Sequence, residues 1–353
     1  MFCIAAFIVL LVLGTFSARY RGYIRRAWGC AVRRMTLRPC DTSFSQDIKD
    51  HLLAPVAAWR PGLVRPAAVA IEIGALLIVI TTVWSAYVVA KGALNLWVYG
   101  TCDKANPQGC ALGAEACSIG DSTPSFLDSL LRLDIVGAVG NEVGDVVDTV
   151  TSIPDRLRTW DAADYLPEDA TWLSGADEAR PTALEIVDPG CSVCAQLAAN
   201  IQQAGFADRY NLTYIAYPIP GPMGTKFPNS DLVVSYLEAL RLHPLDGATV
   251  PVDWQILERI LTGASPDGTA WQTVVNESST EDVTALLHAW MAEMGLDQAA
   301  IDGVAAEAGS EQVAQRIEAN QQLVRDAIST RKIPTLIFDG ARHDGLVGVD
   351  DLR

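Results

Sequence analysis

The sequence predicts an α/β domain with a long helical insertion, preceded by two apolar segments. Three observations support this fold class. A short apolar strand, a turn, a Cys-x-x-Cys pair, a helix and a second strand follow one another between residues 182 and 217. Helical patterns fill most of residues 230–331, and a strand–turn–strand pattern follows at 335–348. The two apolar segments lie within the first 90 residues.

The apolar segments are predicted to be transmembrane helices. The first covers residues 1–17 without a charge, and the second covers residues 66–90 with only Glu72 interrupting. Roughly 17–25 apolar residues suffice to span a bilayer. A signal peptide carries its positive charges before the apolar region, whereas an Arg cluster follows residues 1–17 here. The alternative for this first segment is a buried helix of a soluble domain.

The charges are distributed unevenly along the chain. Residues 18–65 carry a net charge of +7 and residues 66–353 a net charge of −23, within a total of −16. The positive-inside rule therefore predicts that 18–65 is a basic cytoplasmic loop and that everything after residue 90 lies outside. The acidic outer part lacks the clustered Lys and Arg that binding to nucleic acid requires. We expect a two-helix transmembrane hairpin, hence a two-pass protein of the cell membrane, and no nucleic-acid partner.

Two further segments separate the second apolar run from the α/β domain. Residues 91–123 form a cysteine-bearing extracytoplasmic segment. Residues 124–180 read as a helical connector and an acidic linker, because apolar residues recur every three or four positions over 126–157. We expect Pro154 to end or kink this helix. Its apolar face would pack on the outer domain or, alternatively, form a dimer face.

Local signals set the order of elements in the domain, residues 181–353. Thr182–Val187 reads as a buried strand because it is a short apolar run closed by Asp188-Pro189-Gly190. A helix from Cys194 ends before Gly205, and Asn211–Tyr217 reads as the next strand. The helical insertion covers about 225–331. Strand Thr335–Phe338 then turns at Asp339-Gly340 into a hairpin partner.

Cys191 and Cys194 are the candidate catalytic pair. The free N–H groups at a helix N-terminus favour a thiolate on the first cysteine, and thiolate is the attacking species in disulfide exchange. The second cysteine, one turn along, is near enough to close or open a disulfide. A zinc site needs about four ligands, and none of the four His pairs with another at ligand spacing. We expect no metal and no cofactor; a purely structural disulfide is the alternative.

The segment Leu184–Cys194 resembles the active-site strand and helix start of DsbA-like thiol–disulfide oxidoreductases of the thioredoxin superfamily. The segment Lys332-Ile-Pro-Thr335 is similar to the cis-proline loop of that family. The 140 residues from Cys194 to Pro334 fit the helical domain that such proteins insert. The resemblance covers about 181–353 and implies a thioredoxin-like fold with a helical insertion.

The resemblance also implies roles for the site residues. The first cysteine of the pair would be the nucleophile and the second the resolving thiol. Glu185 would be a buried acid that assists proton transfer with Cys194; the alternative is a strand-edge Glu that faces solvent. Ile333 would offer backbone hydrogen bonds to an extended substrate. The Ile333-Pro334 bond would be cis, and Pro334 and Thr335 would belong to the same substrate-binding loop.

The sequence departs from the family at two places. Ser192 and Val193 stand between the cysteines, without the Pro or His that strongly oxidising members tend to show. We therefore expect a less oxidising couple than theirs. The chain also stops at Arg353, where the family's last helix would begin at Val349, so a truncated sequence is one explanation.

Cys102, Cys110 and Cys117 precede the domain, and three is an odd number for disulfides. One interpretation is a structural disulfide plus one leftover thiol. The other is a redox relay, in which one of them, or Cys3, exchanges electrons with the catalytic pair. The sequence does not decide between the two.

Taken together, the sequence predicts a membrane-embedded enzyme that forms or reshuffles disulfides in protein substrates outside the membrane. One alternative is a thiol reductase that receives electrons from a membrane redox partner. The other is a thioredoxin-fold binding or chaperone module in which the cysteines form a structural disulfide.

Overall fold

A computed structural model describes residues 50, 53–102, 116–119, 132–167, 169–221, 224–244 and 250–353. The chain forms two compact units, residues 1–91 and 92–353. The first predicted transmembrane segment, residues 1–17, lies outside the described residues, as does most of the predicted cytoplasmic loop. The predicted two-helix hairpin therefore stays a prediction.

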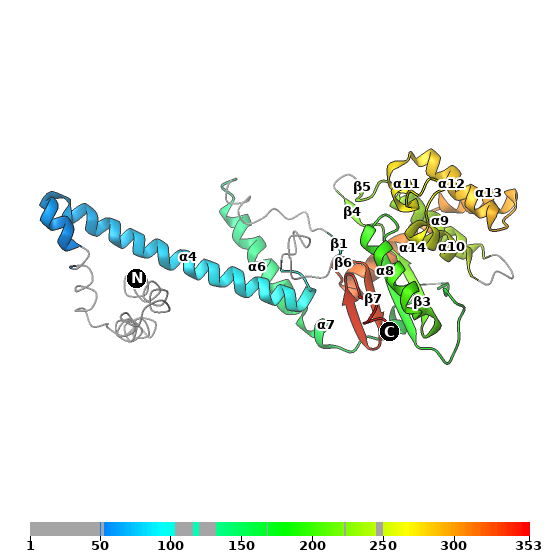
Figure 1. Ribbon diagram of the computed structural model, residues 1–353, viewed down its shortest axis with the longest axis horizontal. Helices are drawn as coiled ribbons and strands as arrows, with labels where there is room; N and C mark the ends of the chain where they lie inside the picture. Colours follow the sequence, from blue (N-terminus) through cyan, green and yellow to red (C-terminus); the bar gives the residue numbers. More distant parts are fainter. Residues whose placement is uncertain are drawn as a thin grey trace. The chain divides into compact units, whose positions relative to one another are not determined.

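The second apolar segment is part of a long helix, α4, which runs from Val64 to Tyr99 (Figure 1). Together with the short 3-10 helix η2 (Pro61–Leu63), α4 forms a helical span of 39 residues, which is long and apolar enough to cross a membrane. Apolar side chains such as Val83 and Val89 are exposed along it. The helix extends nine residues past the predicted boundary at residue 90, because Lys91 ends the apolar run but not the helix. It stops where Gly100 adopts a positive φ of 67°.

The predicted connector consists of two helices, α6 (Ile135–Thr151) and α7 (Ile153–Leu157). Pro154 lies in the first turn of α7, which confirms the predicted break. The apolar face of α6 is exposed, with Val136 at 86% and Val143 at 57%. The predicted packing of this face on the outer domain is therefore wrong for the described residues, and the dimer face stays a prediction.

The α/β layer is a four-stranded sheet in the order β3-β2-β7-β8. Its strands are β2 (Thr182–Val187), β3 (Asn211–Ala216), β7 (Thr335–Phe338) and β8 (Ala341–Asp344). β2 runs parallel to β3 and antiparallel to β7, and β7 and β8 form a hairpin. Helix α8 (Ser192–Ala204) and the short η5 (Phe206–Asp208) connect β2 to β3. The predicted strands and hairpin are confirmed, and α8 begins two residues earlier than predicted.

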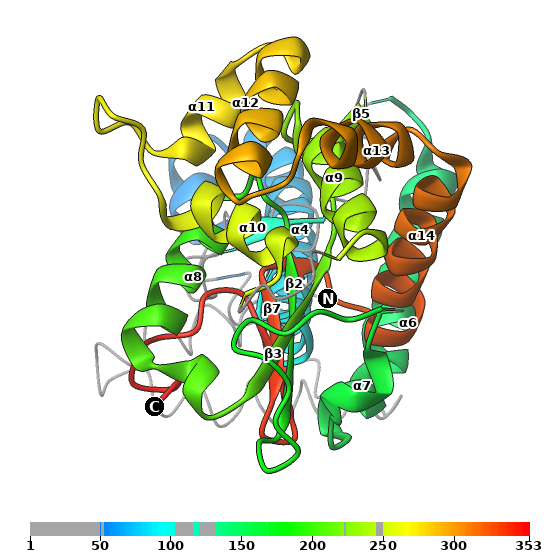
Figure 2. The same cartoon turned by 90° about the vertical axis from the view of Figure 1, so that its right-hand side faces the viewer.

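A helical insertion separates β3 from β7. Its helices are α9 (Ser230–Leu242), α10 (Val252–Thr262), α11 (Trp271–Glu277), α12 (Thr280–Glu293), α13 (Gln298–Ala308), α14 (Glu311–Gln322) and the π-helical η6 (Leu323–Ile328). The sheet lies between α8 and α14 (Figure 2). Short elements complete the unit: β1 (Cys117–Ser118), η4 (Ala162–Tyr165), β4 (Pro220–Gly221), β5 (Gly224–Thr225) and β6 (Lys332–Ile333).

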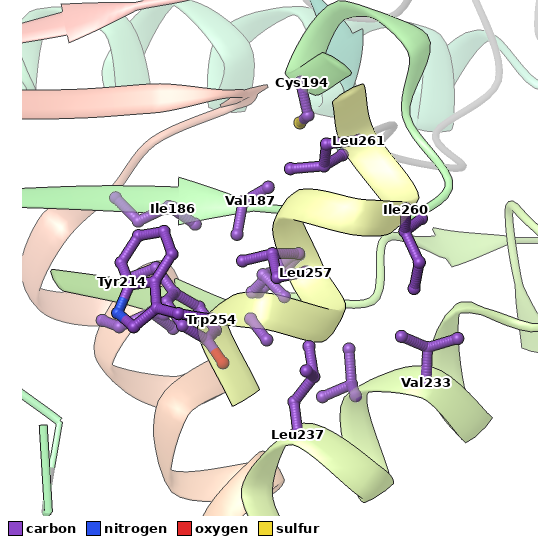
Figure 3. Close-up of a cluster of buried hydrophobic side chains, with 14 of the residues drawn as sticks. Ile186, Val187, Cys194, Tyr214, Val233, Leu237, Trp254, Leu257, Ile260 and Leu261 are labelled. Atoms are coloured by element: carbon purple, nitrogen blue, oxygen red, sulfur yellow. The ribbon is translucent and has the colours of Figure 1, made fainter. Parts of the chain in front are cut away.

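The insertion and the sheet share one apolar core, because α10 packs between them. Trp254 and Leu257 of α10 lie against Ile186 of β2 and Tyr214 of β3, and Leu261 lies beside Cys194 (Figure 3). The architecture is mixed α/β with a helical insertion. Its sheet order and its parallel β2–α8–β3 unit are those of a thioredoxin-like fold, as the resemblance implied.

Candidate active site

Cys191 stands at the start of α8, as its N-cap residue. The amides of Cys194 and Ala195 donate hydrogen bonds to the Cys191 carbonyl, at 3.0 and 3.3 Å. The first turn of the helix contains no acidic side chain. The sulfur of Cys191 therefore lies at the positive end of α8, where a thiolate is favoured.

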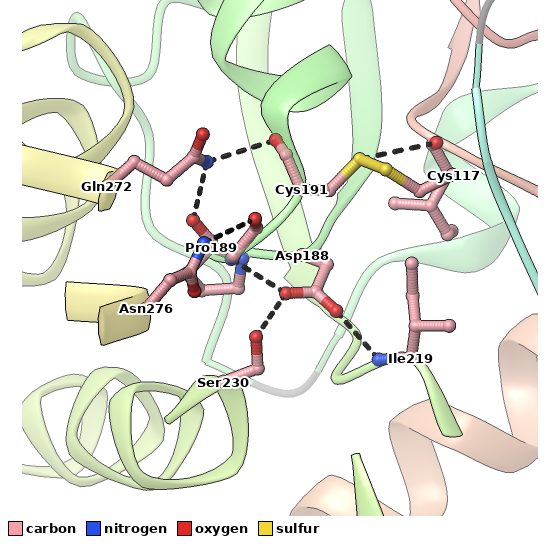
Figure 4. Close-up of a disulfide and its surroundings, with 10 residues drawn as sticks. Cys117, Asp188, Pro189, Cys191, Ile219, Ser230, Gln272 and Asn276 are labelled. Carbon is pink, nitrogen blue, oxygen red and sulfur yellow. Dashed lines mark hydrogen bonds between the residues drawn. A yellow bond between two sulfur atoms is a disulfide. The ribbon is translucent and has the colours of Figure 1, made fainter. Parts of the chain in front are cut away.

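Asp188 organises the turn that leads from β2 into α8. One carboxylate oxygen accepts hydrogen bonds from the Gly190 amide at 2.8 Å and from the Ser230 hydroxyl, and the other accepts from the Ile219 amide at 2.8 Å (Figure 4). Burial raises the pKa of Asp188, although these donors act in the opposite direction. Gly190 is required by space, because an added Cβ would lie 2.4 Å from the Cβ of Phe227.

Two amide side chains of α11 hold the same turn from the other side. Gln272 Nε2 donates to the carbonyls of Pro189 at 2.7 Å and Cys191 at 3.0 Å, and Asn276 Nδ2 donates to the Gly190 carbonyl at 2.9 Å (Figure 4). Sequence reasoning missed both residues. Their spacing of four places them on one helix face, but nothing in the sequence says that this face meets the active-site turn.

The cysteine pair is not joined in this structure, because Cys191 forms a disulfide with Cys117 instead. Cys117 belongs to β1, which pairs antiparallel with β6 in the register Cys117↔Ile333. The amide of Ile119 continues this pairing by donating to the Arg331 carbonyl at 3.1 Å. This strand pairing brings Cys117 to Cys191, with their Cα atoms 6.3 Å apart.

The other two cysteines of the predicted relay set do not meet the pair in the described structure. Cys102 is disulfide-bonded, but not to Cys191, and Cys110 lies outside the described residues. The structure thus brings together one of the three candidates and the catalytic pair. The sequence alone did not indicate which of the three cysteines lies beside the catalytic pair.

Cys194 is a free, fully buried thiol one turn behind Cys191. Its sulfur lies among apolar side chains, next to Leu261 (Figure 3). Burial raises its pKa well above the usual value of 9.0, and the charges of Glu185 and Asp188 add to this rise. Cys194 therefore stays protonated until a neighbouring base takes its proton.

Glu185 lies in the middle of the sheet, on β2 between Tyr214 of β3 and Leu336 of β7. It is 3% exposed, so the alternative of a solvent-facing strand-edge Glu is wrong. One carboxyl oxygen has no hydrogen-bond partner among the residues that the structure describes. Burial, with a smaller contribution from the charge of Glu258, raises the pKa of Glu185 to about 8. A carboxyl of this pKa can release and take up a proton near neutral pH.

The loop at 332–335 faces Cys191, as the resemblance implied. The Ile333-Pro334 bond is cis, and the Ile333 carbonyl oxygen lies 3.8 Å from the Cys191 sulfur. Because this sulfur is part of a disulfide, the contact is not a hydrogen bond. The hydroxyl of Thr335 is used within the loop, where it donates to the Lys332 carbonyl at 2.6 Å. Thr335 therefore stabilises the loop, and its predicted part in substrate binding stays a prediction.

No protein-family model matches the sequence, and no curated protein matches it. Among solved structures, the chain is similar to a thioredoxin-like oxidoreductase from Silicibacter pomeroyi DSS-3, with 20% identity, a TM-score of 0.37 and coverage of 52% of this chain and 88% of that chain. It is also similar to the thiol-disulfide exchange protein alpha-DsbA2 from Wolbachia pipientis, with 20% identity, a TM-score of 0.36 and coverage of 51% and 82%. A third is MdbA, a thiol-disulfide oxidoreductase from Corynebacterium matruchotii, with 17% identity, a TM-score of 0.37 and coverage of 51% and 84%. The thioredoxin-like fold of this chain rests on its own sheet order and on the loop that faces its cysteine pair.

Proposed function

We propose that this chain is a membrane-tethered, extracytoplasmic thiol–disulfide oxidoreductase that forms or reshuffles protein disulfides through Cys191 and Cys194. One observation carries the proposal. The free thiol of Cys194 lies one turn behind Cys191, whose sulfur is already engaged in a disulfide with an extended strand. A disulfide backed by a second thiol is the arrangement that exchange chemistry needs.

In the proposed reaction, a client thiolate attacks the sulfur of Cys191 in a Cys191–Cys194 disulfide. The bond between the pair breaks, Cys194 leaves as a thiolate, and a mixed disulfide joins the client to Cys191. A second client thiolate then displaces Cys191, so the client loses two electrons and the pair gains them. Glu185 supplies the proton that Cys194 takes up. A membrane redox partner would reoxidise the pair.

The tether and the location are part of the same proposal. The apolar, exposed side chains of α4 fit lipid contact, and the 39-residue span formed by η2 and α4 exceeds the roughly 20 residues that cross a bilayer. The basic residues before it and the acidic residues after it favour an outward-facing domain. Disulfides persist in that environment.

Trapping of client proteins tests the proposal. Because Cys191 is bonded to Cys117 in the structure, the trap is made in a Cys117→Ser background. There a Cys194→Ala change leaves no thiol of the pair to resolve mixed disulfides, so the double variant should retain clients on Cys191, and a further Cys191→Ser change should retain none. Gel shifts that reverse on reduction, followed by peptide mapping, measure this. The reduction potential of the pair then indicates the direction of electron flow. A value above about −200 mV favours an oxidase or isomerase, and a value near −270 mV favours a reductase.

The burial of the Cys117–Cys191 disulfide favours a second candidate, a binding or chaperone module in which this bond is a structural staple. In that case wild-type protein does not oxidise a reduced test protein, and the Cys117→Ser, Cys194→Ala double variant traps no client. A chaperone module should also prevent aggregation of an unfolded protein, and the wild-type chain and a Cys191→Ser variant should do so equally well.

A further inference from the structure

The strand β1 occupies the edge of β6, directly beside the candidate nucleophile. An exposed strand edge presents unpaired N–H and C=O groups, and extended peptides bind proteins by adding a strand there. In this chain Cys117 and Ser118 pair with Ile333 and Lys332 in that manner, and the Cys117 sulfur is bonded to Cys191 (Figure 4). An extended segment with a cysteine bonded to the nucleophile has the geometry of a substrate in mixed-disulfide linkage.

The same segment closes the site. Cys191 and Ile333 are both 0% exposed, and Cys117 is 4% exposed. A thiolate attacks a disulfide by approaching one of its sulfur atoms, so an external thiol needs access to that sulfur. Access to Cys191 therefore requires that β1 leaves β6 first.

The segment also stays close when it leaves, because the chain before it is held at the same loop. The ammonium group of Lys332 donates to the Gly100 carbonyl at 2.6 Å, and 16 residues separate Gly100 from Cys117. A short linker gives the tethered group an effective concentration of about a millimolar. A released Cys117 thiol would thus compete strongly with clients for Cys191.

We propose that Cys117 is a third redox-active cysteine and that residues 117–119 are a tethered internal substrate, which occupies the client position until Cys194 displaces it. This inference rests on the proposed function, because it assigns Cys191 and Cys194 the same exchange roles. It predicts a closed state with the Cys117–Cys191 disulfide and an open state with the Cys191–Cys194 disulfide.

The step between the two states is balanced within the chain. Cys194 gives its proton to the ionised Glu185, and the Cys194 thiolate attacks the sulfur of Cys191. The Cys191–Cys194 bond forms, the Cys117–Cys191 bond breaks, and Cys117 leaves as a thiolate. The thiolate takes up a proton from solvent while Glu185 releases the proton of Cys194 to solvent, so the number of protons is unchanged. One disulfide and one thiol exist before and after, so no external oxidant or reductant is needed.

Maleimide labelling of the full-length protein in detergent, without reductant, tests the step. We expect Cys117 to become labelled in wild type because Cys194 releases it, and the Cys191–Cys194 disulfide to accumulate as labelling removes the Cys117 thiol. In Cys194→Ser, with Cys194→Ala as a second variant, labelling of Cys117 should be at least tenfold slower. Peptide mapping distinguishes Cys117 from the other cysteines. Equal labelling rates in wild type and both variants overturn the proposal.

The rate at which a reduced, unfolded test protein is oxidised distinguishes the internal-substrate proposal from the proposed function. With a test protein near 1 μM, competition by a millimolar tethered thiol predicts that Cys117→Ser forms the client mixed disulfide up to about 10³-fold faster than wild type. If wild type and Cys117→Ser both oxidise the test protein and do so at equal rates, the internal-substrate proposal fails and the proposed function stands. If Cys117 labelling depends on Cys194 but neither protein oxidises the test protein, the proposed function fails instead.

Discussion

Replacing Glu185 by Gln should remove a pH-dependent loss of stability from the protein. The carboxyl is buried on the central strand and its pKa is raised from 4.5 to about 8. A glutamine keeps the size of the protonated acid but cannot ionise. The variant therefore isolates the effect of the charge on Glu185 from the effect of its volume.

The direction and size of the effect follow from this pKa. Between pH 4.5 and about 8 the folded protein keeps a proton on Glu185 that the unfolded chain has lost. Stability therefore falls as pH rises through this window and levels off above it. Each pKa unit corresponds to about 1.4 kcal/mol, so the loss reaches at most about 5 kcal/mol by pH 8. Burial supplies most of this penalty, because desolvation is its largest cause.

Urea unfolding of full-length wild type and Glu185→Gln, followed by tryptophan fluorescence from pH 5 to 9, measures the effect. The difference in free energy of unfolding should change by several kcal/mol in favour of the variant as pH rises, by the linkage above. Glu258→Gln serves as a control: because the charge of Glu258 raises the pKa of Glu185, its removal should shift the window to lower pH without abolishing it. A pH-independent difference in free energy of unfolding between wild type and Glu185→Gln would contradict a raised pKa of Glu185.

Three further predictions concern the active-site turn and the thiols. Gln272→Leu removes the side-chain donor to the Pro189 carbonyl and one of the donors to the Cys191 carbonyl, which keeps the amides of Cys194 and Ala195, so we expect a loss of about 1–3 kcal/mol in urea unfolding, with a shifted reduction potential. Gly190→Ala drives a methyl group into Phe227 and should cost about 1–3 kcal/mol, measured in the same way; unchanged stability would contradict the close approach. In the reduced protein, iodoacetamide at pH 7 should label Cys191 and spare Cys194, because burial raises the pKa of the Cys194 thiol. Equal labelling of both would be the opposite result.

The sequence predicted the parts of the fold that local signals define. The run Thr182–Val187 and its Asp-Pro-Gly turn mark the end of a buried strand, and Gly205 ends α8 in a left-handed conformation. The cysteine spacing and the proline at 334 were visible because their chemistry depends on residue type. The burial of Glu185 was implied by the resemblance at Leu184–Cys194, whereas the residues alone left a solvent-facing position open.

The remaining features depend on contacts between distant segments. Cys117 reaches Cys191 through two-residue strands that carry no periodic signal, across a sequence separation of 74. Gln272 reaches the turn because of how the helical insertion packs, which no local pattern encodes. The end of α4 was placed too early because hydropathy reports the apolar run, whereas the helix continues to the left-handed Gly100.

Disulfide mapping across a series of glutathione redox buffers tests whether Cys191 exchanges between Cys194 and Cys117. The full-length protein is equilibrated, quenched with acid, alkylated and digested, and the partner of Cys191 is identified at each potential. We expect Cys191 to be paired with Cys194 in part of the population and with Cys117 in the rest, and to become a free thiol as the buffer becomes more reducing. A Cys191 that stays bonded to Cys117 alone until the protein unfolds, with Cys194 always a free thiol, would contradict this exchange.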